Sequence, residues 1–247
     1  MLLAAWGACP VVTPSWATLI EAAPDPAVVT DPVLRQRITA TGLAWRVRDT
    51  STQIEMLLVP PGTFDMGCSA SNQYGCNGDE KPVHAVTLTN AFYLGRYEVT
   101  QSQWQARMGA NPSIFQSAST QVPAAQVPNR PVEGVSWNTI QGYLGATGMR
   151  LPTEAEWEYA CRAGTQTPFY NNSTDDNTLG DLAWYSPNSG NQTRPVGGMA
   201  ANAFGFHDML GNVSEWVNDW YGTYPSTAQT NPMGPARGSA RVIRGGS

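Results

Sequence analysis

The 247-residue sequence predicts an α+β protein whose short helices and hairpins are joined by much irregular loop. Apolar and polar residues alternate over short runs bounded by Gly, Pro and Asn, which is typical of strands. Other runs begin at a Ser, Thr or Asp cap and stop at glycine after about ten residues, which is typical of short helices. Charged residues are only 13% of the chain, about half the usual share, and loop-forming residues take their place.

Composition also limits the kinds of partner. With 41% hydrophobic residues, the chain can bury one large core. It has no apolar run of about 18 residues, so the sequence predicts no transmembrane segment. The net charge is −5 and no cluster of Lys and Arg is present, whereas binding to nucleic acid needs several closely placed cations. We therefore exclude nucleic acid as a partner.

The sequence divides into an N-terminal lead-in, residues 1–53, and a domain, residues 54–247. Within the lead-in, "DPVLRQRITATG" predicts a short helix. Asp31 is placed as its N-cap, Pro32 at its first position and Gly42 as its stop, because each residue type suits that position.

The first residues, "MLLAAWGACPVV", have two interpretations that stay open. An apolar patch that ends in small residues and Cys9 resembles the stub of a secretory or lipoprotein signal, but it has no basic region before it. The other interpretation is an ordinary mobile N-terminus. Low charge, many Asn and Thr residues and paired cysteines favour an extracytoplasmic or secreted location.

The remaining three cysteines predict one disulfide and one buried thiol. Cys68 and Cys76 flank a Gly- and Asn-rich loop that can bring their sulfurs together. Cys161 shares a helical face with a tryptophan, which predicts a buried side chain. A structural zinc ion needs more ligands than this pair, and the spacing of His84 and His207 does not supply them.

The domain begins with strands and continues with capped helices. "IEMLLVPPGTFDMG" predicts two strands on either side of a Pro-Pro-Gly turn, and "VHAVTLTNAFYLGRYEVT" predicts two more. Three short helices follow, capped by Thr100, Ser136 and Thr153, and each is expected to end at glycine. "RVIRGGS" predicts a short strand that begins at Arg241 and runs into a turn at the Gly245-Gly246 pair.

Six phrases in this order resemble the formylglycine-generating enzyme family, also called the sulfatase-modifying factor domain: "IEMLLVPPGTFDMG", "FYLGRYEVTQSQW", "RPVEGVSW", "MRLPTEAEWEYACRAG", "NAFGFHDMLGNVSEWVNDW" and "RVIRGGS". The resemblance runs from Ile54 to Ser247. It implies a C-type-lectin-like fold with little regular structure.

The resemblance implies an oxygen-dependent oxidase that converts a sulfatase cysteine to formylglycine, with copper(I) held by two cysteine thiolates. Soft thiolates select copper(I), so the pair is indispensable to that reaction. In the family the pair follows the "GGS" turn. Ser247, where this sequence stops, matches a serine of the family's active site. We therefore expect the chain as given to have no catalytic residues and to bind copper only if a further C-terminal segment supplies two cysteines.

The phrase "HDMLGNVSEW" carries over from the family as a calcium loop. The resemblance assigns side-chain oxygens of Asp208 and Glu215 and backbone carbonyls of Gly211 and Val213 as ligands, and calcium prefers oxygen. In an extended chain Gly211, Val213 and Glu215 would point the same way, because they are every second residue. The alternative is that Asp208 caps a turn and Glu215 pairs with an arginine. Ser214 stands where the family often has Trp, which removes an aromatic wall near the active site.

Two functions stay open at this stage. One is the oxidase, with its C-terminal segment missing from a truncated chain. The other is a non-catalytic ligand-binding protein on the same fold, such as a variable protein of a diversity-generating retroelement. The partner would be a sulfatase-type substrate in the first case and a protein or peptide ligand in the second. The nine Trp and nine Tyr residues suit either surface.

Overall fold

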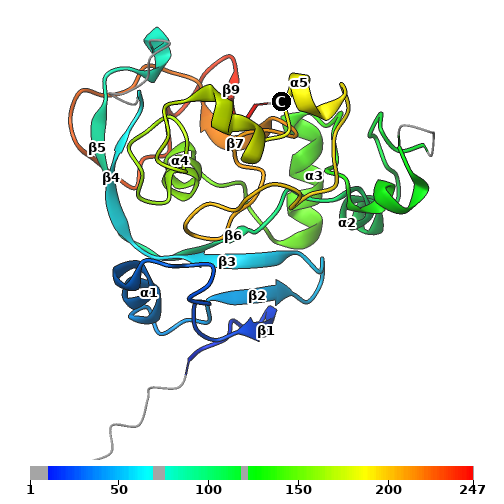
Figure 1. Ribbon diagram of the computed structural model, residues 1–247, viewed down its shortest axis with the longest axis horizontal. Coiled ribbons are helices and arrows are strands. Elements are labelled where there is room, and N and C mark those ends of the chain that lie inside the picture. The colour runs from blue at the N-terminus through cyan, green and yellow to red at the C-terminus, as the bar shows by residue number, and fades with distance from the viewer. Residues whose placement is uncertain (1–10, 69–75, 118–121, 247) are drawn as a thin grey trace, which may run out of the picture.

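The computed structural model describes residues 11–68, 76–117 and 122–246. Its strands form three separate sheets, with the orders β1-β2-β3-β6, β4-β5-β8 and β7-β9 (Figure 1). The strands are β1 (Ala17–Glu21), β2 (Arg46–Asp49), β3 (Glu55–Val59), β4 (Gly62–Met66), β5 (His84–Leu88), β6 (Phe92–Gly95), β7 (Glu215–Trp220), β8 (Gln229–Thr230) and β9 (Arg241–Arg244). The α-helices are α1 (Pro32–Thr39), α2 (Gln101–Met108), α3 (Trp137–Thr147), α4 (Glu154–Arg162) and α5 (Ser186–Ser189), with 3₁₀ turns at Gly78–Glu80, Ala124–Asn129 and Asp176–Asp181. The α+β class is confirmed.

The caps that the sequence predicts begin the helices where expected. The side chains of Asp31, Thr100, Ser136 and Thr153 each accept a hydrogen bond from a backbone N–H of the first turn. The expected ends need two corrections. α1 ends at Thr39, three residues before Gly42. α4 stops at Ala163, which takes the left-handed conformation (φ 47°) just before a glycine.

The strand pairs differ from the expected hairpins. β3 and β4 are consecutive but do not pair with each other, and neither do β5 and β6. Instead β3 pairs with β6 and β4 pairs with β5, so the four strands make one long antiparallel ribbon that changes sheet at its middle. The break lies at the Pro60–Pro61 pair, because proline cannot donate a ladder hydrogen bond.

The lead-in is joined to the rest of the molecule through one sheet. β1 and β2 pair in sequence with β3, and the predicted boundary at residue 53 falls in the turn between β2 and β3. Ile38 and Trp45 of the lead-in belong to the same buried cluster as the aromatic residues of α4. The division of the chain at residue 53 stays a prediction.

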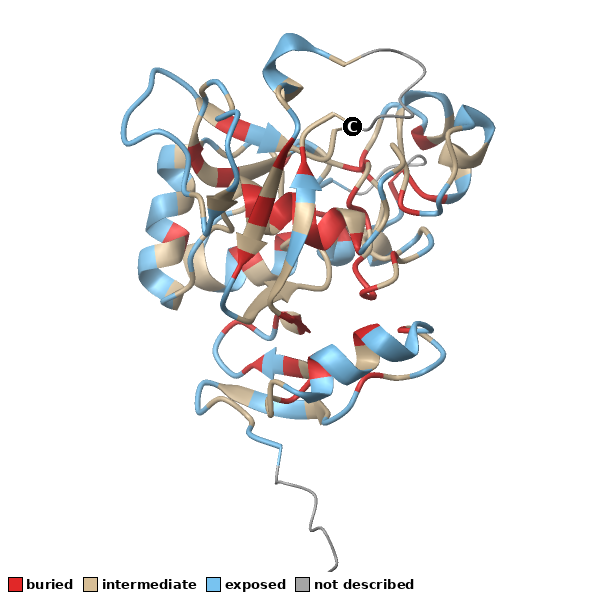
Figure 2. Ribbon diagram, turned by 90° about the vertical axis from the view of Figure 1, so that its left-hand side faces the viewer, coloured by how far each residue is buried: buried red, intermediate tan, exposed pale blue. Residues whose placement is uncertain are grey.

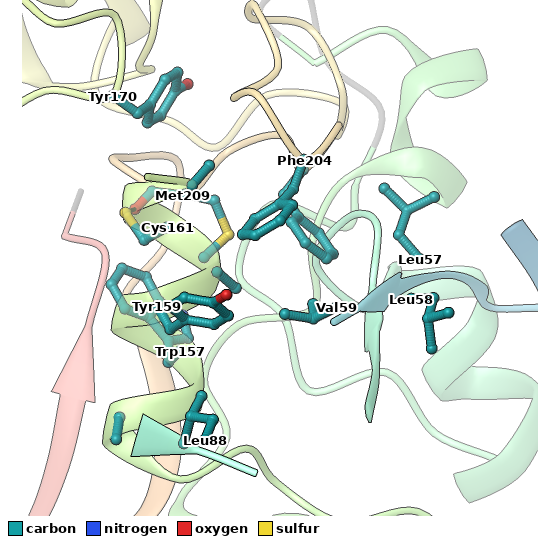
Figure 3. Close-up of a cluster of buried hydrophobic side chains, with 14 of the residues drawn as sticks. Leu57, Leu58, Val59, Leu88, Trp157, Tyr159, Cys161, Tyr170, Phe204 and Met209 are labelled. Atoms are coloured by element: carbon teal, nitrogen blue, oxygen red, sulfur yellow. Dashed lines mark hydrogen bonds between the residues drawn. The ribbon is translucent and has the colours of Figure 1, made fainter. Parts of the chain in front are cut away.

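The core is centred on α4. Figure 2 shows buried residues gathered in the middle of the molecule, and Figure 3 shows Trp157, Tyr159 and Cys161 projecting from α4 into the cluster, with Met209 beside Cys161. A second cluster forms under α2 and α3, where Trp104 and Tyr143 stack with ring centroids 4.9 Å apart. None of the helices in the described part of the chain is long and apolar enough to cross a membrane.

The β7-β9 pair completes the site region. Arg241 of β9 lies between the rings of Trp137 and Trp220, at 3.8 and 3.5 Å from their centroids. This sandwich fixes β9 on β7 across an irregularity in the ladder between Trp216 and Trp220. The loop that enters β7 is thereby held beside α4 and the turn at Gly245.

Candidate calcium loop and polar groove

The loop over residues 208–214 turns sharply before it enters β7. Asp208 and Asn212 both have left-handed backbone conformations, with φ of 59° and 69°. Asp and Asn tolerate this region better than most residues. The expectation of an extended loop, in which Gly211, Val213 and Glu215 point the same way by alternation, is therefore wrong. The loop brings its carbonyls and side chains together by curling.

Asp208 is almost fully buried, at 1% exposure. Its Oδ2 accepts a hydrogen bond of 2.6 Å from the backbone N–H of Gly197, and its Oδ1 has no hydrogen-bond partner among the described residues. Burial raises the pKa of this carboxyl to about 6. A buried oxygen without a donor is costly unless something outside the chain satisfies it.

Glu215 begins β7 and faces α4. Its Oε2 accepts a hydrogen bond of 3.1 Å from Nε1 of Trp157. Burial raises the pKa of Glu215 to about 7, and the negative charge of Asp208 adds to the rise. No arginine forms an ion pair with Glu215 in the described part of the chain, so the alternative in which an arginine neutralises it is not what the structure contains.

Glu98 is a third carboxylate at this site, and sequence reasoning missed it. It accepts hydrogen bonds from the Asn212 side chain at 2.7 Å and from the Val213 N–H at 3.1 Å. Burial raises its pKa well above the ordinary value, and the charges of Asp208 and Glu215 raise it further. In the sequence Glu98 is an acidic residue two positions before the helix cap Thr100, which does not reveal a contact 114 residues away.

The donor set of this loop fits calcium in kind. Calcium binds six to eight oxygens. Asp208, Glu215 and Glu98 have no cationic partner among the described residues, so a bound ion would neutralise their charge. It would also be a partner for the Oδ1 of Asp208, which accepts no hydrogen bond. Asp208 and Glu215 would hold it with their side chains, as would the carbonyls of Gly211 and Val213. The described carboxylates of the loop do not bring three ligand atoms within 4.8 Å of one another, so backbone oxygens would have to complete the shell.

The donor set for copper(I) does not fit. Among the described residues, one group of three candidate ligands lies within 4.8 Å, namely Cys68, Cys76 and Glu80. The first two form the predicted disulfide, with their Cα atoms 5.7 Å apart. Cys161 is a free, buried thiol, as predicted, and burial raises its pKa to about 12. Ser247 lies outside the described residues.

We call residues 208–215 the calcium loop, after the ion that their oxygens would suit. A cavity of about 450 Å³ lies directly beside this loop, and we name the cavity the polar groove. Its walls are residues 132–135, 191–193 and 212–214, together with Phe115, Trp184, Ser186, Ser189 and Trp216. Aromatic rings and short hydroxyl or amide side chains dominate this lining. Such a mixture supplies contact area and hydrogen bonds at once.

A second cavity, of about 400 Å³, lies on the other side of the loop against α4. Glu158 forms its charged wall, with ion pairs to Arg162 at 2.8 Å and to Arg244 at 2.5 Å. Ser214 lines both this cavity and the polar groove. This residue therefore lies at the boundary between the two cavities.

A family model and several relatives identify the family of this chain. The model of the Sulfatase-modifying factor enzyme 1-like domain matches residues 44–247. The chain is 31% identical over 280 residues to the Formylglycine-generating enzyme of Streptomyces coelicolor, covering 92% of this chain and 85% of that protein. It is 33% identical over 213 residues to the Serine/threonine-protein kinase pkn1 of Chlamydia caviae, but it spans only 32% of that relative's length.

A solved structure shares the fold as well. The protein titled Treponema denticola variable protein 1 superposes with a TM-score of 0.68 at 28% identity, over 78% of this chain and 84% of that one. The predicted resemblance is thus confirmed by sequence over most of the chain, and the fold is shared over 78% of it. The chain belongs to the family of sulfatase-modifying factor domains, the family of the formylglycine-generating enzyme.

Proposed function

We propose that this chain is a calcium-stabilised member of the family that binds a polypeptide ligand in the polar groove. The observation that carries the proposal is the position of the groove. One of its walls is residues 212–214 of the calcium loop, so an ion bound by that loop would fix the wall in place. The opposite wall, residues 132–135, starts the segment that leads into α3.

The lining suits extended polypeptide. Phe115 and Trp216 offer ring faces, while Ser186, Ser189 and Gln192 offer hydroxyl and amide groups that pair with a peptide backbone. Its volume of about 450 Å³ accommodates a few side chains of a ligand. The structural likeness to a variable protein supports a recognition role on this fold.

The oxidase is the second candidate, and it is favoured by family membership alone. The described residues offer no thiolate pair near Gly245 and Gly246, and the one free thiol, Cys161, is held protonated by burial. We therefore propose that these 247 residues do not make formylglycine. An oxygen-consumption assay with a cysteine-containing sulfatase peptide and added copper(I) tests this, and turnover would refute it.

A display selection tests the binding function. A library of random peptides is selected on the immobilised protein, and the enriched peptides are titrated by calorimetry. We expect Phe115→Ala and Gln192→Ala to weaken binding at least tenfold, since each removes a contact in the groove. Leu19→Ala is the matched control, because Leu19 is half exposed on β1, away from the groove.

Two results would contradict the proposal. One is a selection that enriches no peptide above background. The other is a set of peptides whose affinity falls with Leu19→Ala but not with the two groove variants.

We also propose an extracytoplasmic location. The disulfide between Cys68 and Cys76 supports it, because such bonds persist in oxidising compartments. Fractionation of the producing cell, followed by detection of the protein outside the cytoplasm, would test it.

A further inference from the structure

A third cavity, of about 330 Å³, lies at the start of α4 and shares no lining residue with the polar groove. Its walls come from the first turn of α4, the end of β7 and the chain between residues 222 and 235, together with Met66 of β4 and His84 of β5. Two carboxylates, Glu154 and Asp219, line it, and no Lys or Arg does so in the described part of the chain. The charged lining is therefore wholly acidic.

Asp219 is the more deeply buried of the two carboxylates, at 3% exposure. Its Oδ2 accepts a hydrogen bond of 2.9 Å from the N–H of Glu154, the first residue of α4. Its Oδ1 accepts no hydrogen bond within the described chain. Gly234 passes so close that a Cβ there would lie 3.0 Å from this oxygen, so only glycine leaves the carboxylate in place. A buried oxygen without a donor favours a donor supplied through the cavity.

The charge of Asp219 has no counter-ion of its own. Arg241 opposes the rise in its pKa, but this arginine is engaged elsewhere and does not line the cavity. The guanidinium lies between the rings of Trp137 and Trp220 and donates to the carbonyl of Asn218 at 2.5 Å. None of the ion pairs among the described residues involves Asp219.

Glu154 belongs to a cluster of charges that is already balanced. Its Oε1 accepts hydrogen bonds from the Tyr224 hydroxyl at 2.8 Å and from Arg244 at 3.4 Å. Arg244 also pairs with Glu158 at 2.5 Å, and Glu158 pairs with Arg162 at 2.8 Å. Two cations offset two carboxylates here, so the cluster has no positive charge to spare for the cavity.

His84 adds a neutral acceptor to the lining. The side chain is 6% exposed, and its ring packs edge-on against Tyr224 with centroids 5.2 Å apart. Its Nδ1 lies 3.1 Å from the carbonyl oxygen of Pro82. A carbonyl only accepts, so Nδ1 carries the proton of the neutral ring and Nε2 is left as an acceptor. The cavity thus presents acceptors from two carboxylates and one imidazole.

We propose that this cavity binds a primary ammonium group on a short aliphatic chain, with Asp219 as its counter-ion and Glu154 and His84 as further acceptors. An ammonium group has three N–H donors and no acceptor, which complements this lining. Met66 and Met233, with the neighbouring prolines of the lining, offer apolar contacts to the aliphatic chain. The group can belong to a free amine or to a lysine side chain of another protein. The site is independent of the polar groove and of the function proposed for it.

The test follows the methyl NMR signals of Met66 and Met233 in the intact protein at about pH 8, where Asp219, with a pKa of about 6, is ionised. Butylammonium represents a free amine and N-acetyl-lysine methylamide represents a lysine side chain. Butan-1-ol lacks the charge, and tetramethylammonium lacks the N–H donors. We expect one or both of the first two probes to shift these signals, and the other two to shift them at least about tenfold less at the same concentration.

Matched variants separate a specific site from general charge. Asp219→Asn is expected to fold, since it removes a buried charge, and to weaken binding of the responding probe about tenfold or more. His84→Phe keeps a ring against Tyr224 but removes the acceptor, and should weaken binding about tenfold. Asp79→Asn removes an equal charge from an exposed residue outside the cavity, where it accepts a hydrogen bond from Tyr221, and should leave the affinity unchanged.

Three results would overturn the ammonium site. Equal shifts with butan-1-ol or tetramethylammonium would mean that the cavity selects apolar bulk or charge alone. An equal loss of affinity in the Asp79→Asn variant would reduce the effect to one of net charge. If neither primary ammonium probe shifts either methyl signal, the cavity does not bind this group.

Discussion

The carboxylates of the calcium loop and those of α4 are buried to similar depths but are balanced differently. Glu158 on α4 is 3% exposed and has two guanidinium partners, Arg162 and Arg244, from its own helix and from β9. Asp208 is 1% exposed, and the donors at its loop are backbone N–H groups, an amide and an indole. Arginines of the chain neutralise the charge of Glu158, whereas no described cation neutralises the carboxylates of the loop.

This difference indicates which region depends on a partner from outside. A buried ion pair needs no further ligand, because each charge stabilises the other. Clustered carboxylates with neutral donors repel one another, so either protons or a cation must offset their charge.

The largest expected effect on stability comes from the ion-paired cluster around Glu158. We expect Glu158→Gln to lower the free energy of unfolding by about 3 to 5 kcal/mol, because two largely buried arginines lose their shared partner. Denaturation in urea measures this. Arg150→Gln is the control: Arg150 is 61% exposed and pairs with Glu156, so the loss should stay below about 1 kcal/mol. Equal losses in the two variants would show that burial does not separate these ion pairs.

The next effect concerns the carboxylates of the calcium loop. Calcium at about a hundred times its dissociation constant should add about 2.7 kcal/mol, or about 5 to 10 °C in Tm for a chain of this size. Asp208→Ala and Glu215→Gln should each lose this increment. Asp181→Asn, at the exposed end of the 3₁₀ turn Asp176–Asp181, should keep it. If a chelator leaves the Tm of the parent unchanged, the loop holds no calcium.

A smaller effect comes from Asp219, a buried carboxylate at the N-terminus of α4, where it accepts a hydrogen bond from the Glu154 N–H. Burial raises its pKa to about 6 from an ordinary value near 3.8, and Glu154 and Glu156 add to the rise while Arg241 opposes it. The folded state therefore holds this proton more tightly than the unfolded state does. The contribution of Asp219 to stability falls as pH rises from about 4 to 6 and stays low above that.

Asp219→Asn removes this dependence. At pH 7 the variant should be more stable than the parent by about 1 to 2 kcal/mol, and the two should converge near pH 4. His84 and Asp219 line one cavity, and His84 is the same in the parent and in the variant. A variant that is less stable than the parent at pH 7 would mean that the hydrogen bond from the Glu154 N–H to Asp219 outweighs the burial cost.

The sequence predicted local features well and long-range ones only through resemblance. Helix caps such as Thr153 and the disulfide between Cys68 and Cys76 depend on residues close together in the chain, so their chemistry is readable locally. Asp208 and Glu215 were placed by a family motif. That motif did not predict the contact of Glu98, which lies 114 residues before Asn212 in the chain.

The other errors have the same origin. The ribbon of β3–β6 could not be distinguished from two hairpins, because strand signals do not state which strand is the partner. The absence of an arginine partner for Glu215 could not be foreseen either, since it depends on where the arginines lie in the folded chain. Charge balance is a property of the folded arrangement.

The assembly of the calcium loop from three distant parts of the chain has a kinetic consequence. Glu98, Trp157 and Asp208 meet only when the ribbon, α4 and the β7 loop are all in place. An ion held there would bind after the rate-limiting step of folding, and it would have to leave before unfolding could proceed. Calcium should therefore slow unfolding and leave the refolding rate unchanged. The folded state would then last longer, but the chain would not reach it faster.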